Sequence, residues 1–372
     1  PDAVVLDRMV DAIRHRGPDD SGTLIDGAIA LGFRRLSIID LSVAGHQPKT
    51  DTDAQVSIIF NGEIYNYLEL KRELAALGHR FRSTSDSEVL LRGYLQWGAE
   101  CVTRLNGMWA FVIADHRRRR LFGSRDRFGI KPLYHCRTAS TMAFASEIKA
   151  LLAGGVVRAE PNLAVAANFL VDNRLDDSDA TFFAGVHALP PAHCFEVDAS
   201  GQYRQWCYWS LEFGRAAPSD PAGAFAELFE DAMRLHMRSD VPVAVHLSGG
   251  LDSTAITCAS ARIRHEAGAA GTLAAFCYLD PQFDEREYID ATLAQTGARM
   301  TPLSCTPRQL WDSLPDALVA HDEPLHSLTP LVGFQLMKLT AQHGIKVVLN
   351  GQGADETLAG YGTYFKAYWH SL

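Results

Sequence analysis

The sequence lacks the features that mark several special classes of protein. No apolar run approaches the ~20 residues that a transmembrane helix needs, and the opening PDAVVLDRMVDAIRHRG is not typical of a secretory signal. The seven cysteines form no CxxC pair, which argues against structural zinc and indicates reduced thiols in a cytoplasmic protein. Positive charge is not in excess, since the formal net charge of −9 argues against non-specific nucleic-acid binding.

Internal repeats and low-complexity tracts are also missing, and 47% hydrophobic and 21% charged residues are ordinary for a globular protein. A length of 372 residues allows two domains with substantial cores. The one basic run, Arg117–Arg120, lies between two apolar segments and therefore predicts a solvated hairpin turn.

The most informative stretch is Val241–Ser253, VPVAVHLSGGLDS. Its alternating valines predict a short buried strand, and the spacing of Ile256, Ala259 and Ile263 predicts a helix after it. The small-residue loop between them would let backbone N–H groups and the helix dipole bind an anion. The alternative for this loop is a glycine turn capped by Ser or Asp.

A second glycine loop, Asn350–Glu356 (NGQGADE), follows the apolar segment Lys346–Leu349. Strands alternate with helices throughout this half of the chain, which predicts a parallel sheet. Ligands of such sheets bind at the carboxyl ends of the strands, where both glycine loops are expected. The alternative for this second loop is a strand-to-helix turn with acidic residues at the helix start.

The first half contains several short predicted strands and few helices, which indicates stacked sheets with helices outside. A linker-like composition follows at Gly214–Gly223. Seven motifs occur in a fixed order over about 150 residues of this half: RHRGPDDSG, RRLSIID, FNGEIYN, STSDSEV, LNGMWAF, RDRFGIKPLY and FASEIKAL.

Together these motifs resemble the glutaminase domain of class II glutamine amidotransferases, specifically that of glutamine-hydrolysing asparagine synthetases. SGGLDS and GQGADE resemble the PP-loop domain of ATP pyrophosphatases. The resemblance implies an α/β and α+β two-domain fold, with an N-terminal αββα sandwich of the Ntn-hydrolase type and a parallel-sheet α/β PP-loop domain. The expected division is a glutaminase domain at 1–208 without its first strand, a linker at 209–224, and an incomplete synthetase domain at 225–372.

The resemblance assigns roles to five residues of the first half. Arg35 would bind the α-carboxylate of glutamine, and Asp86 its α-ammonium group, which Glu63 would help to orient. Asn61 and the Gly62 N–H would form the oxyanion hole. Without the family motifs, Asn61-Gly62 would be read as a tight turn and Asp86 as a helix cap.

The second half carries the residues expected to handle ATP and Mg²⁺. Asp252 and Asp355 would bind the metal, which stabilises charge building on pyrophosphate. Glu356 would position the amino-acid substrate or ammonia, and Asp322-Glu323-Pro324 matches a further acidic motif near the family's active site. The residues expected around ATP are Leu247, Ser248, Gly249, Gly250, Asp252, Ser253, Tyr278, Gly351, Gln352 and Gly353.

The resemblance implies ATP-dependent synthesis of asparagine from aspartate and glutamine-derived ammonia, through β-aspartyl-AMP, with release of AMP and pyrophosphate. The implied partners are glutamine, aspartate and ATP, with no nucleic acid or membrane and with a homodimer as the assembly. Two alternatives stay open. A related amidotransferase would form a lactam or peptide on another carboxylate, and an inactive fragment would serve only for binding.

The sequence departs from the family pattern at both ends. The family's nucleophile is an N-terminal cysteine, but residue 1 is proline and the nearest cysteine is Cys101. The family's catalytic lysine lies beyond the position of Leu372, and nothing places Lys366 at that position. We therefore expect a fragment of a longer protein that, as given, is inactive as a glutaminase.

Overall fold

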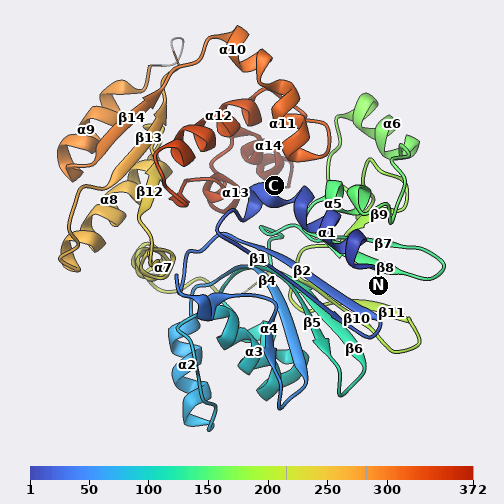
Figure 1. Cartoon of the computed structure of the whole chain (residues 1–372). Helices are drawn as coiled ribbons and strands as arrows, with labels where there is room; N and C mark the ends of the chain where they lie inside the picture. The colour runs from blue at the N-terminus through green and yellow to red at the C-terminus, as the bar shows by residue number, and fades with distance from the viewer. Residues whose placement is uncertain (215, 281–283, 372) are drawn as a thin grey trace. The chain divides into compact units, whose positions relative to one another are not determined.

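The computed structural model describes residues 1–214, 216–280 and 284–371, and the chain forms two compact units (Figure 1). Unit 1 comprises Pro1–Ala216 and Leu318–His326, and unit 2 comprises Ala217–Ala317 and Ser327–Leu372. Within the described ranges, no helix has the length and apolarity needed to cross a membrane. The two units are described separately below.

Unit 1 is built on antiparallel sheets. A six-stranded sheet has the order β11-β10-β6-β5-β4-β3, beside a β1-β2 pair and a three-stranded sheet with the order β8-β7-β9. The strands are β1 (Asp20–Asp26), β2 (Ile29–Arg35), β3 (Lys49–Asp51), β4 (Val56–Ile64), β5 (Gly107–Asp115), β6 (Arg120–Arg125), β7 (Tyr134–Arg137), β8 (Met142–Ala145), β9 (Val186–Ala188), β10 (His193–Val197) and β11 (Tyr203–Cys207).

Helices of unit 1 lie on both outer sides of these sheets. In Figure 1, α2, α3 and α4 lie on one side of the β4–β5–β6 sheet, with α1 and α5 on the other. The helices and 3-10 turns are α1 (Ala3–Ala12), η1 (Arg14–Arg16), η2 (Val43–Gly45), α2 (Tyr67–Ala76), α3 (Asp86–Trp97), η3 (Gly98–Glu100), α4 (Cys101–Arg104), α5 (Ile148–Ala153) and α6 (Leu163–Asp172).

The core of unit 1 follows from strand alternation in β5. Trp109, Phe111 and Ile113 face the helices α2 and α3, whereas Ala110 and Val112 face the opposite direction. The second set packs with Leu133, Leu189 and Phe144 from the segments around β7, β8 and β9. A layer of sheet on sheet with helices outside is therefore present, and the predicted αββα class is confirmed.

Local predictions in unit 1 are mostly confirmed, with one informative correction. Residues 117–120 lie at the hairpin between β5 and β6, as expected. Strand β4 continues through Asn61-Gly62 to Ile64, so the tight-turn alternative is wrong. Ser85 caps α3 through the Ser87 N–H, which leaves Asp86 as the first helical residue and not the cap.

Unit 2 contains a four-stranded parallel sheet with the order β14-β13-β12-β15, which confirms the predicted parallel sheet. In Figure 1, α8 and α9 lie on one side of it and α12 on the other. Its elements are α7 (Pro221–His236), β12 (Val243–His246), α8 (Leu251–Glu266), β13 (Ala274–Tyr278), α9 (Arg286–Thr296), β14 (Arg299–Leu303), α10 (Pro307–Asp312), α12 (Thr329–Gln342), β15 (Val347–Leu349), α13 (Ala354–Leu358) and α14 (Gly362–Ser371). Helix α11 (Leu314–His321) begins in unit 2 and ends in the unit 1 segment Leu318–His326.

The boundary between the linker-like stretch and the first helix of the second half is corrected. Helix α7 begins at Pro221, inside the linker-like stretch, because the Asp220 side chain caps it through the Gly223 N–H. The segment Pro307–His321 forms two helices, α10 and α11. Pro315 has no N–H to donate to the carbonyl four residues earlier, so a continuous helix would lose that hydrogen bond, which accounts for the break at Ser313.

Two candidate ligand-binding sites

The first candidate site lies at the end of β4 in unit 1. Gly62 faces Trp109 across the β4–β5 ladder, and a Cβ at Gly62 would lie 2.1 Å from the Met108 carbonyl oxygen. Only glycine fits such a close approach. Beside it, the Asn61 Nδ2 is buried and has no hydrogen-bond partner among the described residues. A buried amide donor without an acceptor is a suitable group for an oxyanion hole.

Arg35, the last residue of β2, is 7% exposed and lies against the 39–45 loop. Its guanidinium donates to the carbonyl oxygens of Ser42, Ile39 and Asp40, the first two at 3.1 and 3.3 Å. A guanidinium has five N–H groups, so donors remain for a carboxylate ligand. The geometry is compatible with the predicted binding of an α-carboxylate.

Two buried carboxylates face this region. The Asp86 Oδ2 accepts a hydrogen bond from the Ile64 N–H at 3.0 Å, and burial raises the pKa of Asp86 to about 6, against the opposing effects of this bond and of Arg35. Burial, with the charge of Asp86, raises the pKa of Glu63 to about 7. A cationic ammonium group would compensate both carboxylates, as the predicted glutamine site requires.

The second candidate site lies at the carboxyl end of β12 in unit 2. The Ser248 N–H donates to the Ser253 Oγ at 3.1 Å, and the two hydroxyl oxygens are 3.0 Å apart. The Gly250 N–H lies 3.3 Å from the Ser248 Oγ, and Gly249 has a φ of +91° that favours glycine. The loop then enters α8, so its serine hydroxyls and backbone amides gather at a helix N-terminus.

The second glycine loop lies against the first. Strand β15 pairs in parallel with β12, and a Cβ at Gly351 would lie 3.0 Å from the Asp252 Cβ and 3.3 Å from the Ser253 N. Gln352 is exposed and Gly353 has a φ of +95° at the start of α13. The structure therefore brings SGGLDS and GQGADE together at one edge of the sheet, as the parallel topology predicts.

The outer members of the predicted ATP site differ in their surroundings. Tyr278 ends β13 and is half-buried, whereas Leu247 is 1% exposed and packs in the core of unit 2. Asp355 is half-buried in α13, and Glu356 is exposed, with its Oε1 accepting a hydrogen bond from the Tyr361 hydroxyl at 3.0 Å. Leu247 can therefore offer ATP only its backbone or the edge of its side chain.

Comparison with known proteins found a matching family model for each half of the chain. A family model for a glutamine amidotransferase domain matches residues 1–209, and a model for asparagine synthase matches residues 224–372. Asparagine synthetase (glutamine-hydrolysing) 1 of Bacillus subtilis is 33% identical over 97% of this chain and 56% of its own length. The chain belongs to the glutamine-hydrolysing asparagine synthetase family.

Two further relatives extend this comparison. Asparagine synthetase (glutamine-hydrolysing) 3 of B. subtilis is 39% identical over 69% of this chain and 42% of its own length. The amidase chyE of Penicillium rubens is 32% identical over 96% of this chain and 55% of its own length. The chain thus spans about half the length of these curated relatives.

A solved B. subtilis glutamine phosphoribosylpyrophosphate amidotransferase with ADP and GMP covers 82% of this chain and 79% of its own, at 14% identity and a TM-score of 0.42. A likeness at that level adds nothing to the fold described above. Membership of the asparagine synthetase family therefore rests on the sequence comparisons, and the fold class on the sheets themselves.

The carboxylates of the second candidate site, in this member of the asparagine synthetase family, are compatible with Mg²⁺ binding. Asp252 and Asp355 are carboxylates on the two abutting loops, and Mg²⁺ is held by one or two carboxylates together with substrate phosphates. Among the described ranges, no group of three or more His, Cys, Asp or Glu side chains is arranged to hold a metal alone. Substrate oxygens would therefore have to complete the coordination.

Residues that the sequence did not single out surround the glutamine-type site. The Asp126 carboxylate is fully buried, and it accepts hydrogen bonds from the N–H groups of Trp109, Phe128, Ile130 and Lys131 at 2.9–3.2 Å. Asp126 thereby ties the RDRFGIK loop to the strand opposite Gly62. Burial lowers the pKa of Lys131, while the negative charge of Glu63 opposes that shift. Their only sequence signal is their place in the RDRFGIKPLY motif.

The acidic DEP motif makes its described contacts within unit 1. Asp322 and Glu323 lie in the segment Leu318–His326, which is part of unit 1. The Asp322 carboxylate is 3.1 Å from the Lys149 Nζ and accepts the Lys149 N–H, while Glu323 accepts the Phe182 N–H at 2.9 Å. In this structure the motif therefore holds α5 and the segment before β9.

The nearest cysteine to the N-terminus does not replace the family's nucleophile. Cys101 is 1% exposed in the core beside α3, and burial raises the pKa of its thiol well above its usual range. A thiol in that environment is not reactive.

Proposed function

We propose that the protein containing this chain synthesises asparagine from aspartate, using ATP and ammonia released from glutamine. Family membership supports the coarser statement, a glutamine-dependent amide ligase. The observation that carries the proposal is the pairing of SGGLDS with GQGADE in a chain that also holds Asn61, Glu63 and Asp86 around one glutamine-type site. We also propose cytoplasmic action as a homodimer on these small molecules.

In the first site, Arg35 binds the α-carboxylate of glutamine, and Asp86 and Glu63 bind its α-ammonium group. This leaves the side-chain amide beside Asn61 and Gly62. The Asn61 Nδ2–H and the Gly62 N–H donate to the oxygen that becomes negative when the amide carbon turns tetrahedral. Collapse of that centre breaks the C–N bond and releases ammonia. These residues bind and stabilise; the attacking nucleophile is not one of them.

In the second site, the ATP phosphates are bound by the hydroxyls of Ser248 and Ser253 and by the backbone amides of Gly249, Gly250, Gly351 and Gly353. Gln352 lies beside the phosphates, and Leu247 and Tyr278 lie near the nucleoside. Asp252 and Asp355 would hold Mg²⁺, which would neutralise charge on the phosphates. A β-carboxylate oxygen of aspartate attacks the α-phosphorus and pyrophosphate leaves. Ammonia then attacks the acyl carbon, AMP leaves, and the nitrogen loses a proton; Glu356 positions the amino acid or ammonia.

Release of pyrophosphate from ATP by the full-length gene product tests this proposal. We expect pyrophosphate and asparagine in equal amounts when aspartate is the acceptor, with either glutamine or ammonia as the nitrogen source. A Ser253→Ala variant should lose release with both nitrogen sources, whereas Asp86→Asn should lose it with glutamine and retain it with ammonia. Release that is independent of aspartate would overturn the choice of acceptor.

A second candidate keeps both sites and changes the acceptor carboxylate. Its support is the relative named amidase chyE, which matches 96% of this chain at 32% identity. Under this alternative, pyrophosphate release depends on glutamine or ammonia and on a carboxylate other than aspartate. A panel of carboxylic acids in the same assay distinguishes the two candidates.

A further inference from the structure

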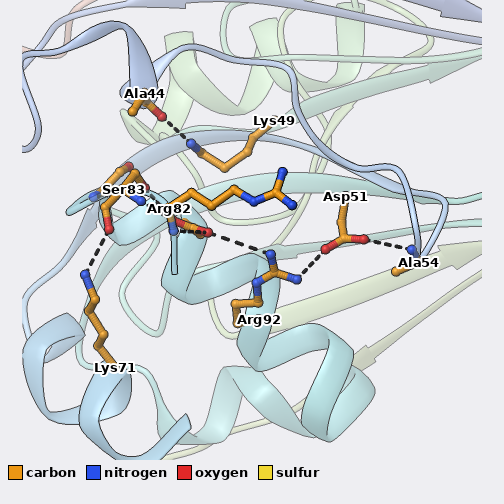
Figure 2. A network of polar contacts seen from close by, with 10 residues as sticks. Ala44, Lys49, Asp51, Ala54, Lys71, Arg82, Ser83 and Arg92 are labelled. Atoms are coloured by element: carbon orange, nitrogen blue, oxygen red, sulfur yellow. Dashed lines mark hydrogen bonds and ion pairs between the residues drawn. The ribbon is translucent and has the colours of Figure 1, made fainter. Parts of the chain in front are cut away.

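A surface cavity of about 200 Å³ lies in unit 1, apart from the side chains assigned to glutamine. It is formed by the strand β3, the η2 turn, the start of α3 and the loop before that helix. Figure 2 shows its polar network. The residues that line it are Ala44, Lys49, Thr50, Asp51, Thr52, Asp53, Arg82, Ser83, Glu88, Leu91 and Arg92.

Two of the three carboxylates in this cavity already have partners. Asp51 pairs with Arg92 and accepts the Ala54 N–H at 2.7 Å. Glu88 accepts the N–H groups of Arg82 and Ser83 and the Ser83 hydroxyl at 2.6–3.1 Å, and it lies 3.7 Å from the Arg92 guanidinium. These bonds hold the pKa values of both carboxylates below their usual range. Asp53 is exposed at the edge of the cavity.

Two cations of the cavity keep unused donors. The Arg82 guanidinium is exposed and makes no hydrogen bond or ion pair with any described residue. In Figure 2 its side chain extends between those of Lys49 and Arg92, and no dashed line reaches the guanidinium. The Lys49 Nζ donates to the Ala44 carbonyl oxygen, and burial lowers the pKa of this ammonium. An ammonium has three donors, so Lys49 also has capacity for a ligand.

We propose that this cavity binds a small anion through a carboxylate or phosphoryl group, held between the Lys49 ammonium and the Arg82 guanidinium. Both cations recognise such groups through charge-assisted hydrogen bonds. The hydroxyls of Thr50, Thr52 and Ser83 also line the cavity. Arg92 pairs with Asp51 and lies near Glu88, so the three cations and three carboxylates of the lining balance in formal charge. The unused donors of Lys49 and Arg82, and not a net positive charge, therefore recognise the anion.

The site is connected to the glutamine-type site through the 39–45 loop, and this step rests on the proposed function. Lys49 holds the loop at the Ala44 carbonyl, and Arg35 holds it at the carbonyls of Ile39, Asp40 and Ser42. A Cβ at Gly45 would lie 1.8 Å from the Arg35 Nη2, so the loop packs directly on that guanidinium. An anion bound to the remaining Lys49 donors draws the ammonium away from the Ala44 carbonyl, which loosens this loop and weakens glutamine binding at Arg35.

Calorimetric titration of the 372-residue chain tests the proposal, with inorganic phosphate as the phosphoryl probe and succinate as the carboxylate probe. The decisive variant is Arg82→Gln, because its exposed guanidinium makes no hydrogen bond or ion pair with any described residue that the substitution would remove. Lys49→Met is the second variant. Arg80→Gln is the matched control, since Arg80 is exposed two residues earlier and does not line the cavity. Ser253→Ala identifies any phosphate bound at the SGGLDS loop instead.

We expect saturable binding of at least one probe, weakened about tenfold or more by Arg82→Gln and by Lys49→Met and unchanged by Arg80→Gln. A saturating probe should raise the Kd of glutamine about fivefold. Absence of saturable binding, or binding indifferent to Arg82→Gln, overturns the site. An unchanged Kd of glutamine overturns its connection to Arg35. Glutamine binding without any anion tests the proposed function separately.

Discussion

At the scale of single residues, the two carboxylates of the glutamine-type site are buried and have raised pKa values. Glu63 is 4% exposed and Asp86 is 6% exposed, and burial raises the pKa of Glu63 to about 7 and that of Asp86 to about 6. Burial makes these carboxylates costly to ionise without a cation nearby, most of all Glu63. We infer that the carboxylates of the ligand-free site are partly protonated and that they release these protons when an ammonium group binds.

The pKa of Glu63 leads to a pH-dependent stability. Because its folded pKa is raised, the folded state binds more protons than the unfolded state between about pH 4.5 and 7, and stability falls as pH rises through that window. His135 and His246, whose pKa values burial lowers to about 4, act in the opposite direction. The contribution of Glu63 is therefore measured as the difference in the free energy of unfolding between wild type and Glu63→Gln.

In urea denaturation, the free energy of unfolding of wild type relative to Glu63→Gln should fall by about 3 kcal/mol from pH 4.5 to 7.5. Glu73→Gln, which changes an exposed glutamate of the same unit, is the control and should show no such trend. A wild-type minus Glu63→Gln difference that is constant with pH would contradict the protonated state of Glu63.

Asn61 leads to a prediction that separates stability from activity. Its Nδ2 has no partner to lose, so Asn61→Ala should change the free energy of unfolding by less than about 1 kcal/mol. Glutamine hydrolysis by the full-length gene product should fall about 100-fold or more, because an oxyanion donor is removed. Gln47 is the matched contrast, since both ends of its amide bond the Phe60 backbone, and Gln47→Ala should destabilise by about 1–3 kcal/mol. Comparable stability losses in the two variants would contradict this account.

At the scale of elements, Gly62 shows that the β4–β5 ladder itself builds the first site. Gly62→Ala would place a Cβ 2.1 Å from the Met108 carbonyl oxygen, at a backbone φ of +155°. Since the contact is with backbone, the strands must separate, and we expect a loss of about 3 kcal/mol in the free energy of unfolding. Gly78→Ala, where no atom lies within 4 Å but φ is +96°, isolates the cost of the backbone conformation alone. Equal losses in both would contradict the steric argument.

The two glycine loops of unit 2 lead to a prediction for ATP. Gly351→Val would push a branched side chain against Asp252 and the Ser253 amide, 3.0 and 3.3 Å from the Cβ position. The loops would then separate, and the affinity for ATP should fall about tenfold or more in equilibrium binding. Gly344→Val, at a site with no atom within 4 Å, is the control for the loss of a glycine. Unchanged ATP affinity in Gly351→Val would contradict the abutting-loop site.

The sequence predicted secondary-structure elements correctly where a local pattern was strong. It failed to predict them where contact with a residue distant in sequence decides the structure. The alternating valines of Val241–Ser253 predicted the position of β12. Asn61-Gly62 has the composition of a turn, but pairing with β5 overrides that preference. The cavity around Arg82 left no local signal, because Arg82 lies in the loop before α3 and Lys49 lies in β3, 33 residues earlier.

At the scale of the whole chain, the arrangement is two units whose sequences are interleaved. Leu318–His326 leaves the synthetase half of the sequence and belongs to unit 1, held by Lys149 and the Phe182 N–H. No composition shift marks this segment, so a division by sequence alone could not find it. The family resemblance did predict both halves and the paired loops, because motif order is a property of the whole chain.

The central claim is that this chain carries two separate sites, one for glutamine and one for ATP. The most direct test is equilibrium binding of each ligand to wild type, Asp86→Asn and Ser253→Ala. We predict that Asp86→Asn weakens glutamine binding and leaves MgATP binding unchanged, and that Ser253→Ala does the reverse. Absence of binding of either ligand to wild type, or loss of both ligands in one variant that remains folded, would contradict the claim.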